Sequence, residues 1–99
     1  MAKVMFTISY KIHPEKRDDY LALSRQMKEH LVMANAKNYA VYESKSKKNS
    51  FTEVYILDTP EEFEQLEDQD EQMAEFIVRL EPMLTNGKMK YTTLIELSE

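Results

Sequence analysis

Two histidines, His13 and His30, are the side chains of this chain that ordinarily titrate near neutral pH. A general base would most naturally be one of them. They lie 17 residues apart and belong to no His-x-x-x-His motif or His-Glu cluster, which argues against a transition-metal site. His13 stands at an expected strand-to-helix junction, where a turn or capping role competes with chemistry. His30 is expected near the C-terminal end of a helix, where an imidazolium complements the helix dipole.

Six tyrosines form a second group of polar candidates, and most of them fall in segments expected to be strands. Tyrosine is an ordinary strand residue with a large apolar body, so packing is the default interpretation. The alternative is that four of them line a cavity and that their hydroxyl groups orient a planar substrate. These four come from four different expected strands: Tyr10, Tyr39, Tyr55 and Tyr91.

The densest run of charge is acidic and spans residues 61–75, where most carboxylates are expected on a solvated helix face. Asp70 differs because it lies in line with the apolar stripe, so it either caps a helix or faces a cleft. A basic run over residues 45–50 is expected at a hairpin tip, as a soluble turn or as a contact with an anionic partner. The chain has one glycine and no cysteine. This composition excludes a phosphate-cradling loop, thiolate metal sites, disulfides and a thiol nucleophile.

Length and composition predict a single domain over residues 1–99, because 42% apolar residues suffice for one compact core but not for two. The net charge of -5, from 18 acidic and 13 basic residues, repels phosphate backbones and anionic lipid. We therefore expect no nucleic-acid partner and no membrane partner. The first residues are apolar only over a strand's length, which fits neither a signal peptide nor a membrane span. Together with the absence of cysteine, this predicts a cytoplasmic protein.

Periodicity divides the chain into six elements. Apolar residues alternate over residues 4–12, which predicts a strand with one strongly apolar face. Pro14 then opens a helix whose apolar residues recur at helical spacing to residue 33. Thr59, Pro60 and Glu62 predict a second helix start, at which the glutamate reaches back to the amide of the threonine cap. The remaining features are strands over residues 39–42 and 51–57, a break near 68–70 that recaps the second helix, a helix end between 82 and 87, and a strand over 88–97.

This order predicts an α+β, ferredoxin-like βαββαβ fold with a four-stranded antiparallel sheet and two helices on one face. The helices cover one face only, yet the third strand is apolar on both, since Val54 and Ile56 alternate with Tyr55 and Leu57. A bare apolar sheet face invites aggregation, so something must cover it. Because two-fold dimers are the commonest oligomers, we expect a homodimer through the sheet faces.

Order and spacing resemble the dimeric α+β barrel superfamily, in particular its antibiotic-biosynthesis-monooxygenase-like domains, over residues 4–97. The segments that carry the resemblance are Ile12-His13-Pro14-Glu15-Lys16, where such domains often read Val-Lys-Pro-Gly-Lys, and Asp58-Thr59-Pro60-Glu61-Glu62-Phe63 after the third strand. The interrupted second helix is similar too. The resemblance implies a ligand held between sheet and helices. The family includes cofactor-free oxygenases of aromatic polyketides and quinols, haem-degrading enzymes, isomerases and members without a known reaction.

Haem degradation is not expected. The similar haem-degrading branch relies on an asparagine of the first strand and on a tryptophan and a histidine of the second helix. These positions align with Thr7, Leu66 and Phe76 here, and the chain has no tryptophan and no histidine after His30. The wider family often has tryptophan near the end of the third strand, where this chain has Tyr55.

The resemblance therefore implies a small-molecule-binding domain that acts as a cofactor-independent monooxygenase on a small aromatic or quinol-like substrate. Such an enzyme positions and desolvates an electron-rich substrate. Thr7 and Tyr55 are the best available polar contacts for this ligand, and Leu66, Asp70 and Phe76 complete the expected ligand-binding set. We expect no metal and no cofactor. The alternative is a non-catalytic dimeric module with a regulatory or assembly role, whose pocket is closed by Leu66, Phe76 and the methionines.

Overall fold

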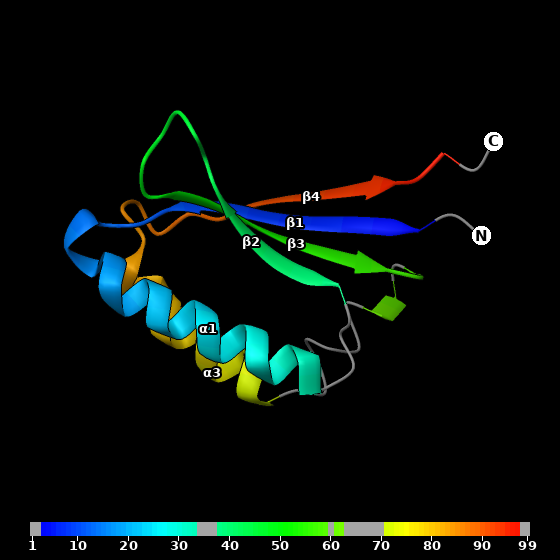
Figure 1. Cartoon of the computed structure of the whole chain (residues 1–99), viewed down its shortest axis with the longest axis horizontal. Coiled ribbons are helices and arrows are strands. Elements are labelled where there is room, and N and C mark those ends of the chain that lie inside the picture. The colour runs from blue at the N-terminus through cyan, green and yellow to red at the C-terminus, as the bar shows by residue number, and fades with distance from the viewer. Residues whose placement is uncertain (1–2, 34–37, 60, 63–70, 98–99) are drawn as a thin grey trace.

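The computed structural model describes residues 3–33, 38–59, 61–62 and 71–97 of the chain. Within these residues, four strands and the helices α1 and α3 form two layers (Figure 1). The bounds in chain order are β1 Val4–Lys11, the 3-10 turn η1 Pro14–Lys16, α1 Arg17–Met33, β2 Tyr39–Glu43, β3 Ser50–Leu57, α3 Glu71–Leu80, the 3-10 turn η2 Glu81–Met83 and β4 Lys90–Ile95. The last strand is shorter at both ends than the predicted 88–97.

The sheet confirms the predicted βαββαβ arrangement. Its strands run antiparallel in the order β2-β3-β1-β4, so β3 and β1 are the central strands. The predicted hairpin of β2 and β3 pairs Tyr39 with Tyr55 and Glu43 with Phe51. Residues paired across a sheet lie on the same face, whereas neighbours along a strand lie on opposite faces. The register therefore determines which side chains meet.

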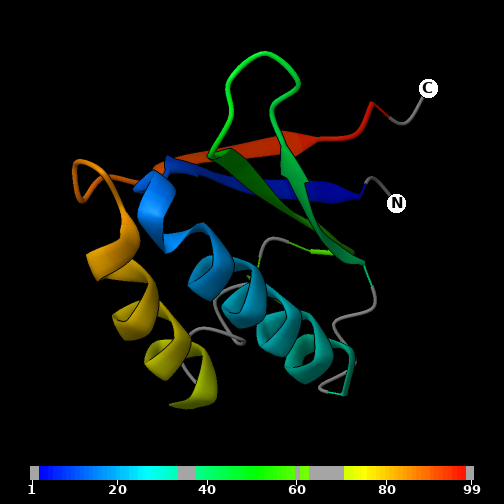
Figure 2. The same cartoon turned by 60° about the vertical axis from the view of Figure 1, so that its left-hand side comes forward.

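Helices α1 and α3 lie side by side on one face of the sheet, as predicted (Figures 1 and 2). The imidazole of His30 in α1 meets the ring of Phe76 in α3 edge to face, with 5.8 Å between the centroids. The Nη1 of Arg79 donates a hydrogen bond to Oε1 of Gln26 at 3.0 Å. We call the sheet face toward these helices the inner face and the opposite one the outer face.

The core lies between the inner face and the helices. In α1, four apolar or aromatic residues recur every three or four positions and form one stripe, and all four are buried: Tyr20, Leu23, Met27 and Leu31. Burial of each such side chain contributes roughly 1.5–3 kcal/mol. In β3, every second side chain is buried and the side chains between them are only half-buried. The buried set of β3 packs against α1, and it includes the acidic residue Glu53.

The helix starts follow the sequence signals with two differences. Pro14 opens a 3-10 turn, and the α-helix itself begins at Arg17. At the second start, Oε2 of Glu62 accepts a hydrogen bond from the N–H of Asp58 at 3.2 Å, not from the predicted amide of Thr59. The carboxylate therefore satisfies a donor one residue earlier, which serves the same need for partners at a helix end. The predicted break at 68–70 lies outside the described residues, and α3 begins directly after it.

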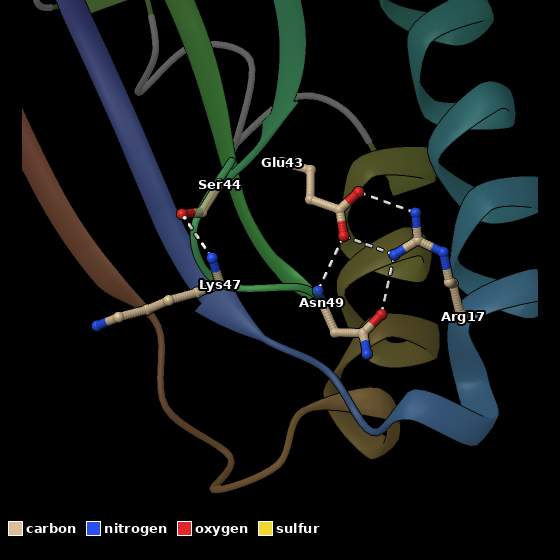
Figure 3. A network of polar contacts seen from close by, with 5 residues as sticks. All are labelled: Arg17, Glu43, Ser44, Lys47 and Asn49. Carbon is tan, nitrogen blue, oxygen red and sulfur yellow. Dashed lines mark hydrogen bonds and ion pairs between the residues drawn. The ribbon is translucent and has the colours of Figure 1, made fainter.

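A polar network ties the β2–β3 hairpin to the first turn of α1 (Figure 3). The guanidinium of Arg17 donates to both carboxylate oxygens of Glu43, at 2.6 and 2.8 Å, and also to Oδ1 of Asn49 at 2.9 Å. The N–H of Asn49 donates to Oε2 of Glu43 at 2.9 Å. Asn49 has a φ of 67°, a left-handed conformation that asparagine tolerates better than most residues. The same Arg17 guanidinium stands 5.7 Å from the centroid of the Phe51 ring.

Candidate functional site

The feature of the inner face that most demands explanation is a carboxylic acid in the core. Glu53 lies in the middle of β3 and is 2% exposed, although its neighbours on that face are aromatic or aliphatic. A carboxylate without partners in such a place would be strongly destabilising. Its hydrogen bonds therefore define the surrounding site.

Three tyrosine hydroxyls from three strands donate hydrogen bonds to this carboxylate. The hydroxyl of Tyr10 in β1 donates to Oε2 at 2.7 Å. Those of Tyr39 in β2 and Tyr55 in β3 donate to Oε1 at 3.0 and 3.1 Å. Because the Tyr10 proton points at Glu53, the Tyr20 hydroxyl of α1, 2.7 Å from that of Tyr10, donates to the Tyr10 oxygen. We call these five residues the carboxylate cluster.

The protonation equilibria of the cluster are shifted by its burial. Desolvation raises the pKa of Glu53 above its usual range, and the hydrogen bonds from the three tyrosines oppose that rise. Burial also raises the pKa of Tyr10 and of Tyr39, and the adjacent Glu53 charge raises both further. The phenols therefore stay protonated as donors, while the carboxylate accepts a proton more readily than an exposed one does.

An aromatic row connects the cluster to the edge of the sheet. One ring from each strand lies on the inner face in the spatial order β2, β3, β1, β4: Tyr39, Tyr55, Phe6 and Tyr91. The centroids are separated by 4.8 Å from Tyr39 to Tyr55, 6.3 Å from Tyr55 to Phe6 and 6.1 Å from Phe6 to Tyr91. Tyr39 and Tyr55 are buried, Phe6 is half-buried and Tyr91 is 59% exposed. The row thus runs from the buried carboxylate to an aromatic surface that faces solvent at β4.

The two polar contacts predicted for one ligand lie on opposite faces of the sheet. Tyr55 pairs with Phe6 on the inner face, whereas Thr7 pairs with Val54 and Thr92 on the outer face. A single chain therefore does not bring the hydroxyls of Thr7 and Tyr55 together. The reason is that side chains alternate along a strand, so Thr7 lies on the face opposite to that of its neighbours Phe6 and Ile8.

Of the other predicted ligand-binding residues, Phe76 is buried in α3 and packs against His30 of α1 as part of the core. Leu66 and Asp70 lie outside the described residues. Of the four tyrosines proposed to orient a substrate, three direct their hydroxyls to Glu53 instead of an open cavity, and the ring of Tyr91 lies at the exposed end of the row.

Sequence reasoning missed Glu53, Tyr20 and Phe6 as members of the site. A signal for the first was present, because Glu53 interrupts the alternation of Phe51, Tyr55 and Leu57 in β3. An acid in an apolar row of a strand is a buried polar group that needs partners. That signal was obscured because the intervening residues Val54 and Ile56 are apolar too.

The histidines stand apart from the cluster. His13 precedes η1, and its side chain makes no capping hydrogen bond; its N–H donates to the carbonyl of Met83 at 2.8 Å. Among the described residues, no three histidine, aspartate or glutamate side chains gather as ligands for a metal ion. None of the helices in this part of the chain is long and apolar enough to cross a membrane. Of the polar groups on the inner face, the carboxylate cluster is the one that adjoins the aromatic row, through Tyr39 and Tyr55.

Comparison with known proteins identifies the fold. No family model and no curated protein matches the sequence. A structure from Bordetella bronchiseptica, provisionally assigned as an antibiotic biosynthesis monooxygenase, matches with a TM-score of 0.81 over 98% of this chain and 99% of its own, at 13% identity. One from Deinococcus radiodurans with the same provisional assignment also has a TM-score of 0.81, over 97% and 93% of the two chains, at 16% identity.

A third match is a NIPSNAP family protein from Agrobacterium tumefaciens, with a TM-score of 0.72 over 97% of this chain and 94% of its own, at 16% identity. At such low identity the likeness shows the fold alone. The chain therefore has the ferredoxin-like α+β fold of antibiotic-biosynthesis-monooxygenase-like domains, as the sequence predicted.

Proposed function

We propose that the protein is a small-molecule-binding domain that acts as a cofactor-independent monooxygenase on an aromatic or quinol-like substrate. The observation that carries this proposal is the hydrogen bond from Tyr55 to the buried Glu53, beside an aromatic row that reaches solvent at Tyr91. A flat aromatic ligand stacks favourably on such rings. The row supplies the binding surface, and the cluster supplies a proton acceptor behind it.

The chemistry requires a proton to leave the substrate. A substrate hydroxyl that donates to the Tyr55 oxygen passes its proton into the cluster as Tyr55 passes its own to Glu53. The resulting anion is electron-rich enough to reduce dioxygen, the co-substrate. Where the substrate carries a methylene group, one oxygen atom becomes its carbonyl oxygen, and the other leaves as water with the two hydrogens. The raised pKa of Glu53 favours proton acceptance in this scheme.

The alternative function is a non-catalytic dimeric module with a regulatory or assembly role. One observation favours it: Glu53 is 2% exposed and accepts three tyrosine hydroxyls, so its hydrogen-bonding needs are met inside the core. Such a network can serve only to specify the packing of β1, β2 and β3. The two functions differ in whether Tyr55 contacts a ligand.

A homodimer through the outer faces of two sheets belongs to both alternatives. The apolar half of this face comprises Met5, Val54, Ile56 and Leu94, which the register places together. A hollow of about 290 Å³ lies over three of them, beside Lys3 and Glu96. A second copy would remove this apolar surface from water, at roughly 25 cal/mol per Å² buried.

Native mass spectrometry of the protein as purified from cells is the first test, because one spectrum reports both the oligomer and any retained small molecule. A dimer with added mass would support a ligand-binding domain and identify the compound for oxygen-consumption assays. A dimer without added mass would favour the non-catalytic module. A monomer would contradict the dimeric barrel.

Two matched variants then test the role of Tyr55. Tyr55→Phe and Tyr39→Phe each remove one donor to the same oxygen of Glu53, but only Tyr55 adjoins Phe6, which in turn contacts the exposed ring of Tyr91. We expect Tyr55→Phe to abolish ligand retention and oxygen consumption, and Tyr39→Phe to preserve both. The two variants should have similar melting temperatures, because each loses one hydrogen bond to Glu53. Equal activity of the two variants would remove Tyr55 from the site and leave the structural network as the better account.

A further inference from the structure

A groove of about 640 Å³ lies at the hairpin end of the sheet, where outer-face residues of β1 and β3 line it together with their inner-face neighbours Tyr10 and Phe51. Its volume falls within the usual range for small-molecule sites. Two hydroxyl side chains lie on its floor, and four lysines line it: Lys11, Lys47, Lys88 and Lys90. These lysines come from β1, the hairpin loop, the segment that leads into β4 and β4 itself, so the fold gathers charge that is scattered along the sequence.

The charge of this groove is opposite to that of the chain. The protein carries 18 acidic and 13 basic residues, yet the groove has four lysines and one acid among its lining residues. That acid, Glu43, is already neutralised by the bidentate bond from Arg17. Figure 3 shows the side chain of Lys47 extending away from this pair. Within the described residues, no ion pair involves any of the four lysines. Four ammonium groups around one hollow produce a local positive potential that an anion would relieve.

The floor of the groove supplies hydrogen-bonding partners as well as charge. One row of the sheet, in the order β2, β3, β1, β4, pairs Tyr42, Thr52, Ser9 and Lys90. The hydroxyls of Ser9 and Thr52 lie 2.9 Å apart and share one hydrogen bond, which leaves the second hydroxyl proton for a ligand. The ring of Tyr42, which is 62% exposed, stands at one end of this row, and Lys90 stands at the other.

We infer that this groove binds a small polyanion that carries phosphate or carboxylate groups. The lysines provide the ammonium donors, the hydroxyl pair provides a donor at the floor, and Tyr42 provides an apolar wall. Charge-assisted hydrogen bonds to such oxygens are stronger than those between neutral groups. The anion site does not depend on the proposed oxygenase function, because Ser9, Thr52 and Lys90 lie on the outer face and the aromatic row lies on the inner face.

The test is a titration of the 15N-labelled full chain with inorganic phosphate, pyrophosphate and citrate, at constant ionic strength set with chloride. We expect saturable amide shifts centred on Ser9, Thr52 and Lys90. Saturation by the two phosphates alone identifies a phosphate site, and saturation by citrate alone identifies a carboxylate site. If none of the three anions gives a saturable shift, the proposal is wrong.

Two double variants with the same change in net charge separate the site from bulk electrostatics. K88Q/K90Q removes two groove lysines, whereas K16Q/K28Q removes two exposed lysines from η1 and α1. We expect affinity to fall by about tenfold or more in the first variant, as lost charge-assisted bonds imply, and to change less than about twofold in the second. An equal loss in both would show that the anions respond to net charge and would overturn the site.

A third variant and one further measurement complete the test. Ser9→Ala removes one hydroxyl of the floor without removing charge, and we expect it to weaken binding severalfold. Sedimentation velocity of K88Q/K90Q tests the alternative that a second copy of the chain, and not an anion, occupies the groove. A change in oligomeric mass without anion binding to the wild type would make the groove a contact between copies and reject the anion site.

Discussion

At the residue scale, two opposing effects act on the protonation of Glu53. Its burial favours the neutral acid, and the hydroxyls of Tyr10, Tyr39 and Tyr55 favour the anion. Removal of one partner of a buried polar group costs more than the hydrogen bond itself contributed, because the remaining partner stays desolvated. The stability of the cluster therefore depends on each of its donors.

Tyr10→Phe tests this dependence. The substitution keeps the ring but removes the donor at 2.7 Å from Glu53 and the acceptor of the Tyr20 hydroxyl. We expect the free energy of unfolding to fall by about 2 kcal/mol in urea titrations. Tyr42→Phe is the matched control, because Tyr42 lies exposed on the outer face, and its loss should stay within about 0.5 kcal/mol. Equal effects of the two variants would show that the cluster contributes nothing specific.

The pKa of Glu43 is lowered, in contrast to that of Glu53, and this predicts that the stability of the fold decreases at acidic pH. The Arg17 guanidinium lowers the pKa of Glu43 to about 2 from its ordinary 4.5, helped by the N–H of Asn49. Because the folded pKa lies below the unfolded one, the stabilisation is complete above pH 4.5 and is lost as the pH falls toward 2. The pair is partly exposed, so solvent and salt reduce its contribution.

Chemical unfolding of the wild type and Glu43→Gln between pH 7 and pH 2 measures this contribution. We expect the difference in stability between the two proteins to shrink as the pH falls below 4.5. Taking the difference cancels the contribution of Glu53, whose raised pKa makes stability fall as the pH rises through its folded value. A difference that is independent of pH over this range would exclude a shifted Glu43.

The β2–β3 hairpin is the element on which several features converge. Its loop places Asn49 in the left-handed conformation, and the polar network fixes the loop against the start of α1. The same loop carries Lys47 into the proposed anion groove. Hairpin geometry therefore affects both the packing of α1 and the outer face.

Asn49→Ala and Asn49→Gly separate the two contributions of this residue. Both lose the Oδ1 acceptor for Arg17, but only alanine places a Cβ atom in the left-handed conformation. We expect Asn49→Ala to be about 1 kcal/mol less stable than Asn49→Gly by urea unfolding. If alanine equals or exceeds glycine in stability, the backbone of this loop does not require a positive φ.

The complete molecule presents an outer sheet face whose two halves differ in chemistry. One half is apolar around Leu94 and Ile56, and the other carries the lysine groove. The proposed homodimer through the apolar half leads to a direct prediction for the assembly. Leu94→Lys adds a charge to a side chain that is 52% exposed, so it should preserve the fold while it places two like charges in the contact between copies.

Sedimentation equilibrium should therefore give the mass of a monomer for Leu94→Lys at concentrations at which we expect the wild type to be dimeric. Val78→Lys is the matched control, since Val78 is 67% exposed on α3, away from the outer face, and should leave the wild-type mass unchanged. If Leu94→Lys stays dimeric, the copies meet through some other surface.

Local patterns were sufficient to predict the order of the elements, their antiparallel pairing and the placement of both helices on one face. The alternation in β1, the stripe from Tyr20 to Leu31 and the proline at the start of η1 each act within a few residues. Such signals need no knowledge of distant contacts. The same is true of the hairpin, whose two strands are close in the sequence.

The carboxylate cluster could not be predicted in this way, because it depends on which face of β3 turns toward α1. Val54 and Ile56 on one face are about as apolar as Phe51 and Leu57 on the other, so hydrophobicity alone left the choice open. Pairing with β1 and packing against α1 turn Glu53 inward and bring together tyrosine hydroxyls that are distant in the sequence. Periodicity along one strand specifies alternation, whereas the choice of the buried face and the cross-strand neighbours come from tertiary packing.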